Sequence, residues 1–375
     1  MKKTLLAAAV LAGFAGAAQA ETSVTLYGIV DVGVGYQQIK GGGIDKASRV
    51  GLIDGVQSGS RWGLRGSEDL GDGLRAIFTL ESGFNSRRGT SGQGSRLFGR
   101  QATLGLASDN WGTITIGRQT NVSSDFFGPI DPFAASYGQS HIGSSFGQTA
   151  TLRYDNAVKY LTPSFGGFQV GALYSFDINE GAATEFQTNR KDRAINAGVR
   201  YVNGPLNVAA SYDRINGNSA LTRDSDRINS WLVGGTYDFE VVKLALAYGQ
   251  SKDGWIGSAS PGLQDGNTLG LTGFNGNVFN DGLKVKSYLV GLSAPVGPGS
   301  LFGSWQRADP NEALAVAATP AGADAGATQN VYSLGYTYDL SKRTNVYAYG
   351  SYAKNYAFLD DVKSTAVGLG LRHRF

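Results

Sequence analysis

Apolar and polar side chains alternate along most of this chain, and the last nine residues show the pattern well. They read VGLGLRHRF, with Val367, Leu369 and Leu371 on one face of an extended strand. Arg372 and Arg374 lie on the other face, and the final residue is aromatic. In a soluble protein such a strand would be an exposed edge prone to aggregation. Repeated many times, the same alternation is what a membrane-spanning β-barrel needs.

Segments with this period of two recur along the chain and are joined alternately by short turns and long loops. Sixteen strands are predicted, at residues 24–36, 60–69, 74–84, 96–107, 113–118, 151–161, 168–176, 194–202, 206–214, 228–239, 241–252, 284–294, 301–307, 330–340, 344–355 and 363–375. An even number of strands places both chain ends on the side of the short turns, as in bacterial outer-membrane barrels. The pattern leaves the facing of 96–107, 284–294 and 301–307 open.

A secreted β-sandwich is the main alternative for such alternation. It would not usually need sixteen strands, nor carry Trp and Tyr on its apolar face near strand ends. Positions suited to the interfacial girdles of a membrane barrel are occupied here by Trp62, Trp231, Tyr237, Tyr332 and Tyr338. We therefore expect an all-β protein, a transmembrane 16-stranded antiparallel β-barrel that forms one domain over residues 21–375.

Sixteen strands are enough to leave a water-filled channel, whereas an eight-stranded barrel is filled by side chains. Because Arg or Lys on the lipid face at mid-membrane would cost ~2–4 kcal/mol, the charged face is expected to point inward. The side chains expected to line the channel are Tyr27, Asp31, Arg61, Arg65, Arg75, Glu81, Arg153 and Lys159. The basic ones come from early strands, either as scattered charges on a wet wall or as a positive ladder across the narrowest part.

The connection at residues 120–149 contains aromatic residues and prolines that suit it poorly to a position in open water. Folding it into the barrel would bury Phe126, Phe127 and Phe133 against the wall. It would also present Asp125 and Asp131 to the lumen, opposite the arginines. Opposite charges across a narrow channel create a transverse field, so that passage depends on solute size and charge. We predict that this segment constricts the pore.

The N-terminal sequence and the composition indicate an exported protein. Residues 1–20 have the form of a secretory signal peptide, with two lysines, a short apolar core and an A-x-A cleavage site that ends at Ala20. No later stretch approaches ~18 consecutive apolar residues, so no membrane helix is expected. Cysteine is absent, which excludes disulfides and thiolate chemistry, and glycine is abundant at 55 of 375 residues. The net charge of +3 falls to about +1 without the signal lysines, which argues against a nucleic-acid partner.

Six motifs are spread along the chain after the signal peptide. They are SVTLYGIVD at 23–31, SRWGLRGSEDLG at 60–71, AIFTLESGF at 76–84, WGTITIGRQ at 111–119, RYDNAVKY at 153–160 and the terminal LRHRF. Together they resemble the Gram-negative general porins, in particular the trimeric porins of β-proteobacteria. The resemblance implies a homotrimer in the outer membrane, with the third extracellular loop folded inside each barrel.

The resemblance also implies roles for single residues. It adds Arg100 and Arg118 to the wall residues and assigns Asp125 and Asp131 as acidic residues of the loop. It implies that outer-membrane assembly machinery recognises the strand that ends at Phe375. Outer-membrane lipid and lipopolysaccharide are further expected partners.

We therefore expect an outer-membrane porin, a passive channel for small hydrophilic solutes and ions with a weak preference for anions. No cofactor, metal site or catalytic activity is expected. A solute- or anion-specific channel is the alternative, and conductance that saturates with salt would identify it. A barrel phospholipase or protease is a weaker hypothesis, since neither of the two histidines, His141 and His373, belongs to a recognisable Ser-His-Asp pattern. An adhesin would usually carry a passenger domain, and none is recognised.

Overall fold

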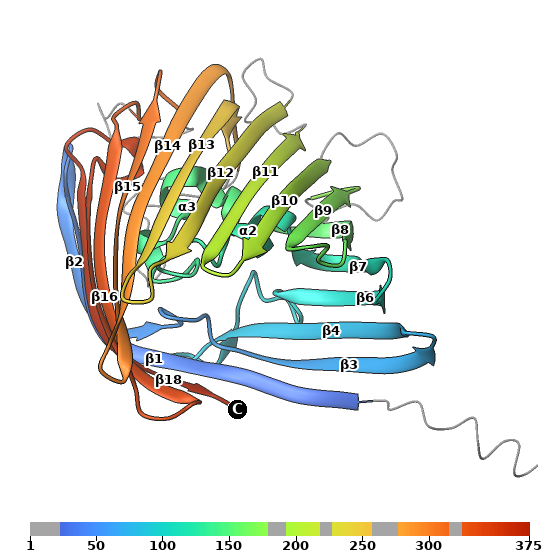
Figure 1. Ribbon diagram of the computed structural model, residues 1–375. Helices are drawn as coiled ribbons and strands as arrows, with labels where there is room; N and C mark the ends of the chain where they lie inside the picture. Colours follow the sequence, from blue (N-terminus) through green and yellow to red (C-terminus); the bar gives the residue numbers. More distant parts are fainter. Residues whose placement is uncertain (1–22, 179–192, 218–226, 257–276, 315–324) are drawn as a thin grey trace, which may run out of the picture.

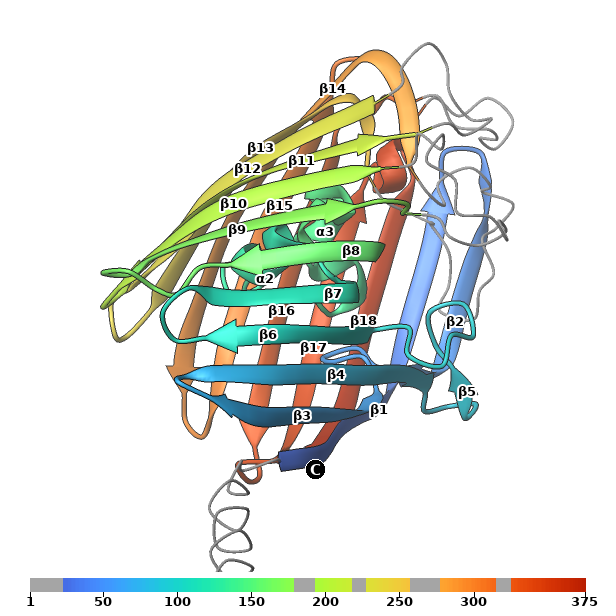
Figure 2. The same ribbon diagram turned by 90° about the vertical axis from the view of Figure 1, so that its right-hand side faces the viewer.

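The computed structural model describes residues 23–178, 193–217, 227–256, 277–314 and 325–375 (Figures 1 and 2). The predicted signal peptide, residues 1–20, lies outside this described part of the chain. The strands are β1 (Ser23–Gly41), β2 (Ile44–Asp54), β3 (Arg61–Gly71), β4 (Leu74–Asn85), β5 (Thr90–Ser91), β6 (Gln101–Ser108), β7 (Gly112–Thr120), β8 (Arg153–Leu161), β9 (Phe168–Ser175), β10 (Ala194–Asn203), β11 (Leu206–Asn216), β12 (Arg227–Asp238), β13 (Lys243–Trp255), β14 (Val278–Val296), β15 (Gly299–Pro310), β16 (Gln329–Asp339), β17 (Thr344–Lys354) and β18 (Lys363–Arg374).

Short helices interrupt the strands at two places. They are α2 (Val122–Phe127), η1 (Gly138–Ser140), α3 (Gly143–Phe146) and η2 (Gly147–Ala150) between β7 and β8, and η3 (Tyr356–Phe358) between β17 and β18. None of the helices in the described residues is long and apolar enough to cross a membrane.

These elements occupy sixteen positions around the barrel, as the sequence predicts. β2 and β3 both pair with β1, because Val32 opposes Asp54 of β2 and Ile29 opposes Arg61 of β3. The two are therefore parts of one broken strand. β5 is a two-residue extension that pairs with the end of β4. Counting β2 with β3 and leaving β5 out gives sixteen antiparallel strands.

The sheet closes on itself because the first and last strands pair. β1 and β18 are antiparallel from Ile29 opposite Arg374 to Lys40 opposite Lys363. At the end of the seam Gly28 and Phe375 exchange two backbone hydrogen bonds, of 3.2 and 3.1 Å. A closed cylinder leaves no unpaired strand edge, which is the condition for crossing a membrane with strands.

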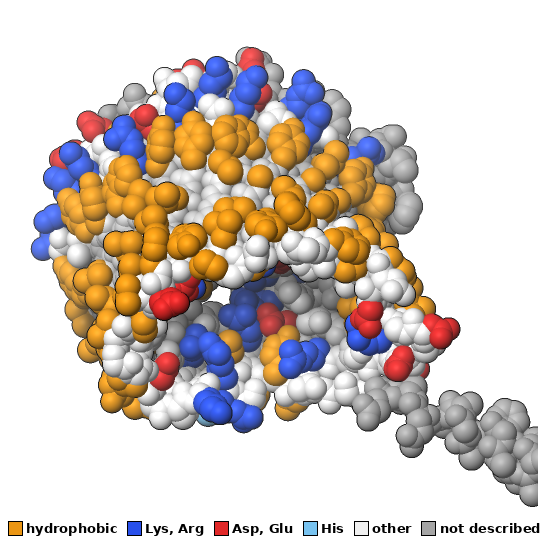
Figure 3. All heavy atoms as spheres, in the orientation of Figure 1, with side chains coloured by type: hydrophobic (Ala, Val, Ile, Leu, Met, Phe, Trp, Pro, Cys, Tyr) orange, Lys and Arg blue, Asp and Glu red, His pale blue; other side chains and the backbone are white. Residues whose placement is uncertain are grey.

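The outer face of the barrel is apolar. On β18 the side chains of Val367, Leu369 and Leu371 are 43%, 64% and 45% exposed, which in water would be unfavourable. Figure 3 shows a broad apolar band with Lys and Arg side chains gathered along its upper edge. The aromatic residues expected in interfacial girdles are all exposed: Trp62, Trp231, Tyr237, Tyr332 and Tyr338.

The segment between β7 and β8 lies against the inner side of the wall. α2 contacts β9, β10 and β11, α3 contacts β13 to β16, and η1 contacts β16 and β17. Figures 1 and 2 show α2 and α3 within the curve of the sheet. Phe126 and Phe127 are buried because the inward positions of these strands carry small or apolar residues such as Ala209 and Leu232. Phe133 is buried in a separate cluster, against Phe302 of β15.

The structure corrects several predicted boundaries. Residues 44–54 were expected in a loop and form β2, whereas the strand expected at 96–107 starts at Gln101 after an irregular stretch that contains Gly92, Gly94 and Gly99. The long loops expected at 254–281 and 309–329 are shorter, since β13 reaches Trp255 and β14 starts at Val278. Parts of both loops lie outside the described residues. Strands that continue beyond the lipid need no apolar outer face, so alternation does not reveal their ends.

Candidate functional site

Cationic side chains gather on the inner wall between β3 and β8. They are Arg61 and Arg65 on β3, Arg96 and Arg100 before β6, Arg118 on β7, and Arg153 and Lys159 on β8. Alternation alone would point Arg118 outward beside Ile116, which is exposed. A register shift between Gly117 and Gln119 turns Arg118 inward, as β-bulges commonly re-aim a side chain.

Glu81 organises the first part of this cationic wall. Its carboxylate accepts hydrogen bonds from Arg100 Nε at 2.6 Å and from the Tyr27 hydroxyl at 2.9 Å. Arg61 lies 3.9 Å from the same carboxylate. Arg65, on the same strand as Arg61, lies over the Tyr27 ring at 5.4 Å from its centroid. Three residues predicted to line the channel thus meet around the carboxylate of a fourth, Glu81, and Arg65 adjoins them.

Asp155 organises the second part. Its two oxygens accept hydrogen bonds from Arg96 at 2.7 Å, and one of them also accepts from Arg118 at 2.6 Å. The Arg118 Nε donates to the Gly99 carbonyl at 2.7 Å, which fixes the guanidinium in place. Arg153 lies within electrostatic range of Arg118, and its buried Nε has no hydrogen-bond partner among the described residues. Arg96 was not predicted, because it falls in the stretch whose facing the sequence left open.

Lys159 connects the wall to the segment inside the barrel. Its ammonium donates to Asp125 of α2 at 2.7 Å and to the Thr120 carbonyl at 3.0 Å. Asp125 accepts a further hydrogen bond from the Thr120 hydroxyl at 2.7 Å. Asp125, predicted as an acidic residue of the loop, therefore forms an ion pair with a cation of the wall.

Positive charge is in excess in this array. Seven cations of the wall, Arg61, Arg65, Arg96, Arg100, Arg118, Arg153 and Lys159, stand against the three carboxylates Glu81, Asp125 and Asp155 that pair with them, an excess of four positive charges. Fixed charge on the wall of a narrow aqueous passage raises the local concentration of the opposite ion. The arrangement can therefore favour anions.

A buried polar network attaches the inner segment to β10 and β11. Asp213 accepts hydrogen bonds from Ser123 Oγ at 2.6 Å and from Asn121 Nδ2 at 3.0 Å. The Asn196 carbonyl oxygen accepts from the backbone N–H of Val122 at 2.6 Å, and its amide donates to Ser123 at 2.8 Å. Asp213 and Asn196 are both fully buried. These contacts position the start of α2, which carries Asp125 toward the cationic wall.

Two predicted channel residues lie apart from the cationic array. Arg75 pairs with Asp109 at 2.9 Å near the short turns. It is six positions from Glu81 along β4, about 20 Å away. Asp31 is fully buried beside the break between β2 and β3, where it accepts from Tyr347 at 2.6 Å. It stabilises the wall of the barrel and does not face the open channel.

Asp131 also differs from its predicted position. Its carboxylate is buried and turned into its own segment, where it accepts three backbone N–H groups at 2.9–3.0 Å, those of Phe133, Ala135 and Ile142. Burial raises the pKa of Asp131 from 3.8 to about 6, against the opposing effect of those hydrogen bonds. The expectation that Asp131 faces the lumen is wrong, because the turn that contains it needs the carboxylate as an acceptor.

We predict that the segment inside the barrel loses stability as pH rises through about 6. Since the folded pKa of Asp131 lies above its unfolded value, its favourable contribution is complete below pH ~4 and disappears above the folded pKa. A shift of about two units corresponds to about 2–3 kcal/mol. Open-channel current noise measures the effect. It is compared at pH 4.5 and pH 7.5, which lie roughly one unit or more below and above the titration of Asp131. Asp131→Asn should abolish the difference in noise, and an unchanged pH response in that variant would contradict the assignment.

His141 has a structural position in the same segment. Its Nδ1 accepts a hydrogen bond from the Gly143 backbone N–H at 2.9 Å. Burial lowers the pKa of His141 to about 4, so the ring is neutral at physiological pH. The described contacts account for the ring as a hydrogen-bond acceptor within the segment.

Comparison with known proteins identifies relatives over the whole chain. The profile of the Gram-negative porin family matches residues 7–357. An outer membrane porin of Bordetella pertussis is 57% identical over 397 residues, covering 100% of both chains. Outer membrane porin protein 32 of Delftia acidovorans is 35% identical and covers 98% of this chain and 92% of that protein.

Solved structures give the same result. The anion-selective porin from Comamonas acidovorans matches with a TM-score of 0.71 and 27% identity, covering 95% of this chain and 100% of that one. A trimeric form of OmpT from Vibrio cholerae shares the fold, with a TM-score of 0.60 and 18% identity over 94% of this chain and 99% of that one.

Proposed function

The chain belongs to the Gram-negative porin family, and we propose that it is a general diffusion channel for small hydrophilic solutes and ions with a weak preference for anions. The outer-membrane barrel itself encloses the passage for solutes, as in the porins to which the chain is similar. The single observation that carries the preference is the excess of four positive charges on the wall between β3 and β8.

The segment 120–149 is proposed to be the constriction, a loop folded into the barrel. Two contacts support this role. Asp213 and Asn196 hold the start of α2 against one side of the barrel, and Lys159 binds Asp125 from the cationic side. The remaining passage is then lined by the carboxylate of Asp125 together with the guanidinium groups of the wall, so that fixed charge of both signs acts on a passing solute.

Recording from the purified protein in a planar lipid bilayer tests the proposal. A general diffusion channel should give single-channel conductance that rises linearly with salt concentration. Under a salt gradient, the measured reversal potential should be displaced toward the equilibrium potential of the anion. A bilayer that conducts no ions after the protein is added would contradict the proposal. A reversal potential displaced toward the equilibrium potential of the cation would contradict the anion preference.

An anion-specific channel is the second candidate. The excess positive charge favours it, and the structural relative from Comamonas acidovorans is described as anion-selective. Specific binding differs from simple attraction because a bound ion occupies the passage. Conductance that saturates with salt, or block by one anion at low concentration, would identify this second function.

Further parts of the proposal concern processing and assembly. We propose that residues 1–20 are removed on export and that the mature protein forms a homotrimer, as the OmpT relative does in its trimeric form. Catalysis has no part in the proposed function, which requires only a fixed aqueous passage. The terminal strand is proposed as the segment that outer-membrane assembly machinery recognises.

We predict that deleting Phe375 lowers the outer-membrane level of the protein several-fold in cells. Phe375 exchanges two backbone hydrogen bonds with Gly28, whose loss should cost the barrel only about 2–3 kcal/mol. Refolding into detergent should therefore still succeed, whereas recognition in the cell should fail. Phe375→Tyr is the matched control, and a normal membrane level of the deletion variant would contradict the assembly role.

A further inference from the structure

The barrel wall contains a large bulge at the break between β2 and β3. Val32 of β1 lies opposite Asp54 of β2, and three positions earlier Ile29 lies opposite Arg61 of β3. Between these two pairs β1 has two residues, whereas the broken strand has the six residues 55–60, an excess of four. The excess residues cannot stay in the plane of the sheet. Bulges of this kind bend the strand and re-aim its side chains, and they are common beside functional sites.

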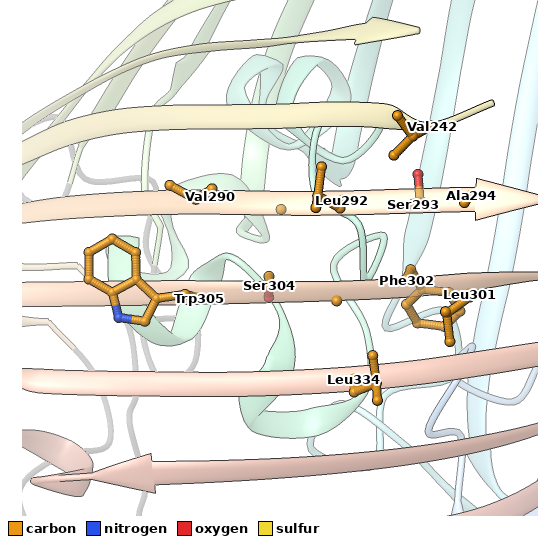
Figure 4. Close-up of a pocket in the computed structure, with 12 residues that line it drawn as sticks. Val242, Val290, Leu292, Ser293, Ala294, Leu301, Phe302, Ser304, Trp305 and Leu334 are labelled. Carbon is orange, nitrogen blue, oxygen red and sulfur yellow. The ribbon is translucent and has the colours of Figure 1, made fainter. Parts of the chain in front are cut away.

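The bulge at residues 55–60 points into the barrel. Val56 is buried in a cluster of aromatic side chains that includes Phe133 and Tyr137 of the inner segment. Phe302 of β15, labelled in Figure 4, belongs to the same cluster and lies 5.0 Å from Phe133 between ring centroids. The Tyr137 backbone N–H also donates to the Val56 carbonyl at 2.6 Å. Because the inner segment lies within the curve of the sheet, a bulge that contacts it projects to the same side.

Three elements fix the bulge in position. The Asp31 carboxylate of β1 accepts a hydrogen bond from the Ser58 backbone N–H at 2.7 Å, and the Asp31 carbonyl accepts from the Gly55 N–H at 3.0 Å. Arg372 of β18 donates to the Ser58 hydroxyl at 3.1 Å. Together with the contact of Tyr137, these hydrogen bonds hold the bulge against β1, β18 and the inner segment. The bulge is therefore a fixed part of the inner surface.

Gly59, near the end of the bulge, borders two arginines of the cationic wall. Its carbonyl accepts a hydrogen bond from Arg61 Nε at 2.8 Å. A Cβ at this position would lie 3.1 Å from Arg100 Nη1, and beyond the adjoining residues no other described atom would lie within 4 Å. A side chain at position 59 would thus extend into open space next to one guanidinium group.

The backbone conformation at Gly59 does not itself require glycine. Gly55, at the start of the bulge, has a φ of 61°, a left-handed conformation that favours glycine. Gly59 lies outside that region. The consequence of having glycine at position 59 is therefore the space that it leaves beside Arg100. Any larger residue would place its side chain between Arg100 and the ions in the passage.

We infer that the bulge at residues 55–60 is a second constricting element of the channel, and that Gly59 determines ion selectivity by leaving Arg100 accessible to anions. The inference rests on the proposed channel function and adds a wall element separate from the segment 120–149. A side chain at position 59 acts in two ways. Its volume narrows the passage, and its charge adds to or offsets the charge of Arg100.

Recording from the purified full-length protein in a planar bilayer tests the inference. The chain has no cysteine, so Gly59→Cys introduces a single thiol. A methanethiosulfonate reagent that carries a sulfonate should react with this thiol, lower the current in discrete steps and lower the ratio of anion to cation permeability about threefold. A reagent that carries a trimethylammonium group should also lower the current, and it should raise the ratio. The parent protein should respond to neither reagent.

Ser300→Cys is the matched control. Ser300 is exposed on the inward face of β15, next to the short turn and outside the cationic wall. Its thiol should react with both reagents and change the permeability ratio much less. If Ser300→Cys reacts and Gly59→Cys reacts with neither reagent, position 59 does not face the passage and the inference is wrong.

Gly59→Gln and Gly59→Glu separate volume from charge, because the two side chains are of nearly equal size. Both should lower single-channel conductance by roughly twofold, whereas only Gly59→Glu should lower the permeability ratio. Parent conductance and selectivity in both variants would overturn the inference and leave the proposed channel function intact. A parent protein that conducts no ions would instead contradict the proposed function. Gly59→Cys carries the smaller side chain and decides the question if the larger variants do not fold.

Discussion

Replacing Arg65 with Glu should lower the ratio of anion to cation permeability by about five- to tenfold. Arg65 is exposed and stacks on Tyr27, so its charge is free to act on ions in the passage. Arg100 and Arg118, by contrast, are each held against a carboxylate at 2.6 Å. The side chain with the least neutralised charge should have the largest effect on selectivity.

The magnitude follows from Coulomb's law in water. A unit charge about 7 Å from an ion contributes about 0.6 kcal/mol, and reversal from Arg to Glu changes the charge by two units. Screening at ~0.1 M salt reduces the total by about half, which leaves a change of roughly threefold for each ion. Anions and cations shift in opposite directions, so the ratio changes by more.

Reversal potentials under a salt gradient measure the ratio, and Arg75→Glu is the matched control. Arg75 lies near the short turns and pairs with Asp109, with its side chain 44% exposed to solvent. Its reversal should change selectivity much less than that of Arg65. Equal shifts of the reversal potential in the two variants would mean that selectivity arises from the charge of the whole channel. An unchanged reversal potential in Arg65→Glu would mean that the cationic wall does not line the narrow passage.

Much of the barrel was predictable because lipid on one side and water on the other impose a strict alternation. The strand at residues 206–214 was predicted in this way, and it forms β11 at Leu206–Asn216. β2 was missed because it carries Lys46 and Arg49 and continues one broken strand with β3. Alternation therefore identifies the strands that cross the lipid, and not where they end.

The charged wall was partly predictable for the same reason. Arg61, Glu81 and Lys159 follow from the facing of their strands, and the structure places them with their partners. Arg118 could be found from the resemblance and not from alternation, since a register shift turns it inward. Asp131 was misplaced because a carboxylate that accepts three backbone N–H groups looks, in sequence, like any other acidic loop residue.

The attachment of the inner segment could not be predicted from the sequence. Asn121 and Asp213 are 92 positions apart, and neither belongs to a motif that indicates the contact. Only the closed barrel brings β11 opposite the end of β7. A polar residue at an inward strand position is expected on a wall that faces water. The sequence position of Asp213 therefore does not indicate that its side chain is buried under α2.

Replacing Asp213 with Ala should release this segment and raise single-channel conductance by roughly twofold, because a sixteen-stranded barrel without a plug leaves a wide aqueous channel. The variant leaves the buried donors of Ser123 and Asn121 without their carboxylate acceptor. Each buried unsatisfied donor costs about 1–3 kcal/mol, so the loss of both acceptor contacts should weaken the attachment by about 2–6 kcal/mol in total. The ion pair of Lys159 with Asp125, whose side chains are 10% and 28% exposed, then remains as the polar contact of α2 with the cationic wall.

Conductance and limited proteolysis of the folded barrel measure this release, with Asp238→Ala as the matched control. Asp238 lies at the end of β12, where it pairs with Lys243 at 3.1 Å and contributes nothing to the buried network under α2. The single-channel conductance of Asp238→Ala should therefore equal that of the parent protein. Asp213→Asn keeps one acceptor oxygen and should fall between parent and Ala. If Asp213→Ala conducts like the parent and its inner segment resists protease, the apolar packing of Phe126 and Phe127 alone holds the segment, and the polar network fixes only its orientation.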